Sequence, residues 1–284
     1  SHCHFRGPAS IDDVLRWLDA VGLDQAAIFS QNPNGAGARV RGYLQQLGKL
    51  ARQSRGRVLP FAWLDPTYRQ VRSALRTAIE SLGFVGVKII PNGWMPYDPP
   101  CMRLYEAVAE LDVPIMFHSG ILWSYGDTSR FCRPANYECL MQLPTLRFSL
   151  AHIGWPWVDE CLAVAGKVAE TRRRRGYQGI QCYVDCTPGT PPAWRRQALQ
   201  RAFDYLPAEA IFFGTDGSPP HGLDWPKAVL QRDRQLLRGL WLPAPCGSAR
   251  QRRAGPQPPD SARPGGAPAI RGRWPPAACP AAAR

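Results

Sequence analysis

The 284-residue sequence lacks long apolar runs, and none approaches the roughly 20 residues that a membrane-spanning helix needs. It also lacks an initial basic segment followed by an apolar one, which is the pattern of a secretory signal. Its nine cysteines are odd in number and scattered, and no two are spaced as a CxxC pair. These absences argue against a membrane protein and a disulfide framework. They predict a soluble, cytoplasmic protein with reduced thiols.

Basic runs interleaved with aromatic residues are also missing, although the formal net charge is +13. About half of this excess comes from residues 242–284, which hold seven Arg and one Asp. The densest internal run, Arg172 to Arg175, precedes Gly176, where a helix is expected to end and cations suit the helix dipole. Without aromatics to stack on bases, we expect no nucleic-acid partner.

A glycine-rich phosphate turn is absent after the first strand-like run, which disfavours an open doubly wound sheet. Instead, apolar runs recur every 24 to 34 residues, with a helical pattern between each pair, one βα unit per step. The runs end at His4, Ile28, Pro60, Lys88, His118, His152, Asp185 and Asp216. Helices are expected between Ser10 and Gly22 and over 39–54, 69–82, 101–111, 134–142, 157–171, 192–205 and 226–240. The pattern predicts a (β/α)8 barrel of the α/β class.

The two ends of the sequence differ from a complete barrel. We expect the barrel over residues 1–241 and a disordered tail over 242–284, where 33 of 43 residues are Pro, Ala, Arg or Gly. The first strand is expected to be truncated, because only Ser1 precedes the His2-Cys-His4 motif. Its neighbours would then be partly unpaired, which would lower stability and metal affinity and would permit a homodimer.

Polar side chains recur at the ends of the predicted strands. His2, His4, His118 and His152 are four of the five histidines in the chain, and Asp216 ends the last run. Because the ends of parallel strands converge at the mouth of a barrel, we expect these groups to meet there. Imidazole and carboxylate are the usual ligands of a catalytic divalent metal. Side chains alternate along a strand, so His2 and His4 share one face while Cys3 points into the barrel wall.

Five segments resemble the amidohydrolase superfamily, and within it the amidohydrolase-related group of metal-dependent hydrolases and decarboxylases. They are Ser1–Phe5, Gly83–Ile90, Met116–Gly120, Leu150–Gly154 and Phe213–Gly217. The resemblance implies one metal ion at the carboxyl-terminal mouth of the barrel, held by His2, His4, His118 and Asp216. It implies that His152 is an acid/base or an additional ligand. Three imidazoles in such a set favour Zn or Mn over Mg or Ca.

The reaction that this site predicts is hydrolysis of a small-molecule amide, lactone or related C–N or C–O bond. The metal would activate a water molecule, Asp216 would take its proton, and His152 would polarise a carbonyl or donate a proton. Two alternatives stay open. One is non-oxidative decarboxylation of an aromatic or unsaturated carboxylic acid at the same site. The other is a barrel fragment without activity.

Lys88 ends the fourth strand. In two-metal members of the superfamily a lysine there is carboxylated and bridges the ions, but the Gly86-Val-Lys88 context resembles the one-metal group. We therefore favour a lysine that pairs with a carboxylate or contacts substrate.

Other residues near the mouth are weaker candidates. Trp94, Trp123 and Arg130 are predicted to bind substrate, as the loops that carry them follow strand ends. Tyr97, Tyr125 and Arg133 lie in the same loops. His221 is expected to be a solvated loop histidine rather than a residue that lines the pocket. For Asp185, a structural hydrogen-bonding role and a catalytic role both stay open.

Overall fold

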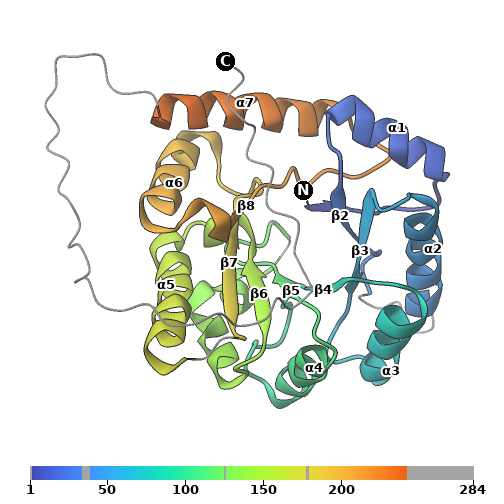
Figure 1. Ribbon diagram of the computed structural model, residues 1–284, viewed down its shortest axis with the longest axis horizontal. Coiled ribbons are helices and arrows are strands. Elements are labelled where there is room, and N and C mark those ends of the chain that lie inside the picture. Colours follow the sequence, from blue (N-terminus) through green and yellow to red (C-terminus); the bar gives the residue numbers. More distant parts are fainter. Residues whose placement is uncertain (1, 34–38, 125, 177–178, 242–284) are drawn as a thin grey trace, which may run out of the picture.

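Eight parallel strands form the centre of the molecule in the computed structural model, which describes residues 2–33, 39–124, 126–176 and 179–241 (Figure 1). The expected tail and Tyr125 lie outside these residues. The strands pair in chain order, each with the next, which is the order of a (β/α)8 barrel. They are β1 (His2–His4), β2 (Ala26–Phe29), β3 (Val58–Trp63), β4 (Gly86–Ile89), β5 (Ile115–Phe117), β6 (Arg147–Leu150), β7 (Gln181–Asp185) and β8 (Ile211–Phe212).

Helices cover the outside of this sheet (Figure 1). They are α1 (Ile11–Val21), α2 (Arg39–Gln53), α3 (Val71–Arg76), α4 (Pro99–Glu110), α5 (Val158–Arg175), α6 (Pro192–Tyr205) and α7 (Asp224–Trp241). The limits of α1 follow from its sequence. The Ser10 hydroxyl accepts a hydrogen bond from the Asp13 amide at 3.1 Å, and Gly22 ends the helix with a left-handed φ of 78°. None of the helices in the described ranges is both long and apolar enough to cross a lipid bilayer.

Two helical segments differ from the sequence prediction. Residues 134–142 form a helix with the expected bounds, but it is a 3-10 helix, η3 (Pro134–Gln142), that follows η2 (Ser129–Cys132). The expected helix 69–82 is α3 followed by a π turn, η1 (Thr77–Ser81). A short 3-10 helix, η4 (Ala151–Gly154), follows β6, and another, η5 (Ala208–Ala210), precedes β8. Hydrophobic periodicity locates these segments, but it does not separate these helix types in short runs.

Strand β1 is as short as expected, with three residues, and it pairs on both of its edges. Its three residues pair with Ala27, Ile28 and Phe29 of β2. On the other edge, the Asp216 amide donates to the His2 carbonyl at 3.1 Å, and the His4 amide donates to the Gly217 carbonyl at 2.8 Å. The segment after β8 thus supplies the second partner of this short strand. These bonds join the first and last strands of the curled sheet at its carboxyl-terminal end.

The barrel interior is small and aromatic. Ala27, Phe29, Phe61 and Met116 form a buried cluster of their own, separate from the larger core that packs the helices onto the strands. Gly86 permits this packing, since a Cβ at that position would lie 2.3 Å from the Phe61 ring. This cluster fills the interior below the carboxyl-terminal mouth.

A buried ion pair holds α6 and α7 to the barrel. The Arg195 guanidinium on α6 lies 2.6 Å from the Asp233 carboxylate on α7, and both residues are almost fully buried. Arg195 also donates to the carbonyl of Cys186, the residue that follows β7. The seven cysteines of the described ranges form no disulfide, so packing and this ion pair hold the outer helices in place.

Candidate metal centre

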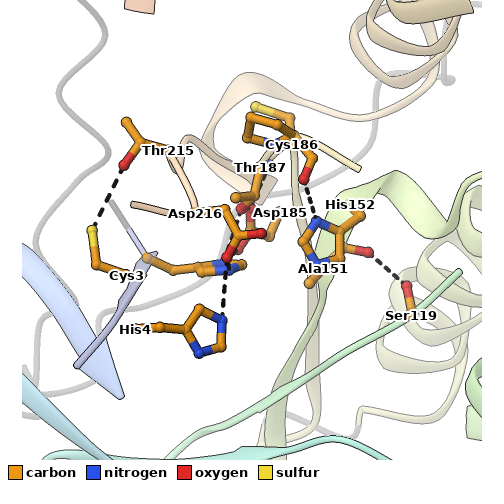
Figure 2. Close-up of polar contacts among 12 residues, drawn as sticks. Cys3, His4, Ser119, Ala151, His152, Asp185, Cys186, Thr187, Thr215 and Asp216 are labelled. Atoms are coloured by element: carbon orange, nitrogen blue, oxygen red, sulfur yellow. Dashed lines mark hydrogen bonds and ion pairs between the residues drawn. The ribbon is translucent and has the colours of Figure 1, made fainter. Parts of the chain in front are cut away.

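His2, His4 and Asp216 form a group that fits a metal ion. One ligand atom from each lies within 4.8 Å of the other two. Asp216 Oδ1 lies 3.3 Å from His2 Nε2 and 3.2 Å from His4 Nε2. Figure 2 shows the Asp216 carboxylate directed at the His4 ring. The structure therefore brings together three of the four side chains that the sequence analysis assigned to the metal.

The backbone explains how these side chains converge. His2 and His4 point into the barrel from alternate positions of β1, and Cys3 points the other way, with its sulfur 3.6 Å from the Thr215 hydroxyl (Figure 2). Asp216 follows β8 by four residues and has a left-handed φ of 54°, which non-glycine residues rarely adopt. Such strain gathers at functional sites, and here it accompanies a carboxylate placed between two histidines.

His2 is oriented by a second carboxylate, that of Asp185, whose role the sequence analysis left open between structural and catalytic. Its Nδ1–H donates to Asp185 Oδ2 at 2.5 Å, at the end of β7. The other oxygen of Asp185 accepts hydrogen bonds from the Thr187 amide, at 2.6 Å, and from the Thr187 hydroxyl. A histidine that binds a metal usually donates its other ring N–H to a carboxylate or carbonyl oxygen. This hydrogen bond fixes the tautomer that leaves Nε2 free to bind.

The donor chemistry of the group suits a cation. With Nδ1 of His2 donating to Asp185, its Nε2 carries a lone pair whenever the ring is neutral, and that lone pair faces Asp216 Oδ1. Two electron-rich atoms 3.3 Å apart repel unless a proton or a metal ion lies between them. Burial alone would lower the pKa of His2, but the Asp185 and Asp216 carboxylates together raise it, as expected for an imidazole beside two anions.

His118 and His152 lie beside this group. Their ring centroids are 4.7 Å apart, and the His152 ring is 5.5 Å from that of His2. The Nε2–H of His118 donates to the Ile121 carbonyl at 3.1 Å, and the Nδ1–H of His152 donates to the Pro188 carbonyl at 2.9 Å. Each ring therefore keeps one nitrogen as an acceptor, Nδ1 in His118 and Nε2 in His152.

The turn that carries His152 is unusual. His152 and Ile153 both have left-handed backbone angles, with φ of 62° and 54°. Gly189 leaves room for the His152 ring, since a Cβ there would lie 2.7 Å from the His152 Cβ. These angles explain why β6 ends at Leu150, two residues before the histidine that was predicted to end it.

The predicted substrate residues fall into two sets. Lys88 is fully buried inside the barrel, with its Nζ 4.8 Å above the centre of the Phe29 ring. Trp94 is also buried. By contrast, Trp123 is 67% exposed and stacks on Trp155, and Arg130 is an exposed residue in an ion pair with Asp127 at 3.2 Å.

The weaker candidates lie mostly at the surface. Tyr97 is exposed, and Arg133 forms a two-pronged ion pair with Glu160. His221 is an exposed loop residue whose carbonyl accepts a hydrogen bond from Trp17. Asp185 is the exception, because it is buried against His2.

Residues 8–259 match the family model described as amidohydrolase, which is most of the chain. The chain belongs to the amidohydrolase family. The matched range begins after the His2 and His4 pair, so their assignment as candidate ligands rests on the geometry given above. No curated protein matches this chain in sequence.

Solved structures of similar fold include both reaction types of the family. A 2,6-dihydroxybenzoate decarboxylase has a TM-score of 0.57 at 17% identity, over 83% of this amidohydrolase and 97% of that chain. A probable 2-pyrone-4,6-dicarboxylic acid hydrolase from Acinetobacter baumannii has a TM-score of 0.56 at 14% identity, over 84% and 91% of the two chains. A 5-carboxyvanillate decarboxylase from Novosphingobium aromaticivorans, complexed with manganese, has a TM-score of 0.54 at 15% identity, over 75% and 72%. These structural similarities establish the fold of this chain and no more.

Proposed function

We propose that the protein is a metal-dependent hydrolase that cleaves a C–N or C–O bond of a small molecule, such as an amide or a lactone. The observation that carries this proposal is the convergence of His2, His4 and Asp216 within 4.8 Å, with the ring of His152 beside them. Membership of a family of metal-dependent hydrolases and decarboxylases supports it.

Each residue of the site has a role that follows from its contacts. His2, His4 and Asp216 would hold one ion, Zn or Mn, with His118 as the fourth ligand through the nitrogen that the Ile121 carbonyl leaves free. When bound, a divalent ion supplies a water that ionises near neutral pH. Asp216 would hold the ion through one carboxylate oxygen, and its other oxygen would accept a hydrogen bond from that water.

His152 acts as a base in this proposal. Burial lowers its pKa to about 4, so the ring is neutral at pH 7. Its Nδ1–H is already donated to Pro188, which leaves Nε2 as an acceptor. Such a nitrogen can receive a proton from the attacking water, whereas it has no proton with which to polarise a carbonyl.

Decarboxylation of a carboxylic acid is the second candidate, and the buried cation of Lys88 favours it. That cation would attract the carboxylate of such a substrate. The likeness to decarboxylases is consistent with this reaction. The same three metal-binding residues would serve, with a proton delivered to carbon.

The test is to load the purified protein with Zn or Mn and to assay lactones, amides and aromatic acids. Acid release without CO2 from a lactone or amide is expected. Release of CO2 from an aromatic acid would favour the second candidate. Stoichiometric metal without turnover of any compound would overturn both.

Variants connect the reaction to these residues. Asp216→Asn should lose the metal. His152→Asn should keep the metal and lose about 10²–10⁴-fold in turnover, the usual contribution of a general base. His221→Asn, in an exposed loop, is the matched control and should retain full turnover. Equal turnover in His152→Asn and His221→Asn would remove His152 from the mechanism.

A further inference from the structure

An open groove lies on the outside of the barrel, between α7 and the end of α1. Figure 1 shows these two helices next to each other on one side of the molecule. The groove has a volume of about 370 Å³, and it shares no residue with the metal centre. A volume of this size lies within the range of small-molecule sites. The groove is therefore large enough for a ligand of its own.

Cations line this groove. Lys227, Arg234 and Arg238 are exposed residues of α7, and their spacing of seven and four positions places all three on one face of the helix. At a rise of about 1.5 Å per residue, the three residues follow the helix axis at intervals of about 10 Å and 6 Å. Gln231 and Gln235 lie between them and add amide N–H donors. The groove thus presents a row of hydrogen-bond donors with three positive charges.

These cations have no counterions in the part of the chain that the structure describes. Among the described residues, no carboxylate forms an ion pair with Lys227, Arg234 or Arg238, and none of those that line the groove is acidic. Near the end of α1, Asp19 is occupied by Arg57, whose Nη1 lies 2.7 Å from its carboxylate. A cleft with charges of one sign concentrates ions of the opposite sign, so this groove attracts anions.

We propose that the groove between α1 and α7 binds a small molecule that carries a diphosphate or triphosphate group. Guanidinium groups bind phosphate through paired N–H donors, and an ammonium adds a point charge. A phosphate chain places several charges close together, whereas an acidic peptide carries one charge per carboxylate, so a groove this short favours phosphate. Val21 and Leu230 supply the apolar part of the lining, against which an uncharged part of the ligand packs.

The experiment measures binding of inorganic tripolyphosphate by titration calorimetry at an ionic strength of about 0.15 M, where long-range attraction between exposed charges is screened. Wild type should bind this probe. The double variant Arg234→Gln, Arg238→Gln should lose at least about tenfold in affinity, the loss expected when charge-assisted hydrogen bonds are removed. An absence of binding to wild type would overturn the proposal.

A matched control comes from α3. The double variant Arg72→Gln, Arg76→Gln makes the same two substitutions at the same spacing, at exposed positions that do not line the groove. Its affinity should stay within about twofold of wild type because of screening. Equal losses in the two double variants would overturn the proposal, since net charge alone would then explain the binding. Thermal denaturation should show wild-type stability for both, as expected for exposed positions.

Two further titrations test the ligand class and the location. A hexaglutamate peptide should bind more weakly than tripolyphosphate, and tighter binding of the peptide would replace the proposal with an acidic protein partner. Because tripolyphosphate chelates divalent ions, Asp216→Asn should bind it as wild type does. An affinity that is lost in Asp216→Asn would place the probe at the metal centre and overturn the proposal. The groove shares no residue with that centre, so this test does not depend on the proposed hydrolase activity.

Discussion

Histidine side chains of the site are held in defined tautomers by groups that are not ligands themselves. His2 donates to Asp185, His118 to the Ile121 carbonyl and His152 to the Pro188 carbonyl. Each hydrogen bond leaves the other ring nitrogen as an acceptor and fixes the direction in which that nitrogen points. The chemistry of the site therefore depends as much on backbone carbonyls and on Asp185 as on the imidazoles.

Burial of His152 predicts how the metal-free protein responds to acid. Its pKa is about 4 when folded and near 6.5 when unfolded, so between these values only the unfolded chain takes up the proton. The stabilisation is complete above pH 6.5 and is lost as the pH falls toward 4. At 1.36 kcal/mol per pKa unit, the loss is roughly 3 kcal/mol. Urea denaturation of chelator-treated protein at pH 7 and 4.5 measures it.

The comparison with His152→Gln isolates this group. The variant should show a smaller loss between the two pH values, since glutamine does not titrate. His118, whose pKa burial also lowers, acts in the same direction, while the raised pKa of His2 acts in the opposite one. Identical losses in wild type and variant would show that His152 is not protonated differentially on unfolding.

At the scale of elements, α6 and α7 reach the metal centre through one buried contact. Arg195 on α6 binds Asp233 on α7 and the carbonyl of Cys186, which directly follows Asp185. The end of β7, which carries the hydrogen-bond partner of His2, is thus tied to two helices on the outside of the barrel.

This contact predicts a large effect from a small change. Asp233→Asn leaves the buried Arg195 guanidinium without its counterion and should lower the free energy of unfolding by about 3–5 kcal/mol. Asp159→Asn removes an exposed partner of Arg201, 3.1 Å away, and should cost less than about 1 kcal/mol. Urea unfolding of the two variants provides the comparison. Similar losses in both would mean that burial does not strengthen the Arg195 pair.

Much of the site was predictable because of the topology. The ends of parallel strands meet at one mouth, so strand-end positions were sufficient to place His2, His4 and Asp216 together. The contacts of single atoms were not predictable. Loop conformation lets a carbonyl only three residues away use the Nε2 of His118, and Lys88 Nζ has no hydrogen-bond partner among the residues that the structure describes. The end of the last strand was also missed, since the run expected to reach Asp216 is a strand only as far as Phe212.

At the scale of the whole molecule, the metal group joins the first strand to the segment after the last. Metal should therefore stabilise the entire barrel. Binding to the folded state alone adds about 4 kcal/mol at a free metal concentration 1,000 times the Kd. Thermal melts should rise with added Zn or Mn and fall with chelator. Asp216→Asn should show neither response. A variant that responded as wild type does would place the ion elsewhere.

The closure of the barrel by β1 and residues 216–217 also has a consequence in time. His2 and Asp216 are 214 positions apart in the chain. At a synthesis rate of about 5–20 residues per second, roughly 10 to 40 seconds separate their appearance on the ribosome. During that interval the histidine pair has no carboxylate opposite it, and the strands that would hold one in place are still being made. If the protein binds metal as proposed, metal acquisition is accordingly one of the last steps in its maturation, after residues 216–217 have docked beside β1.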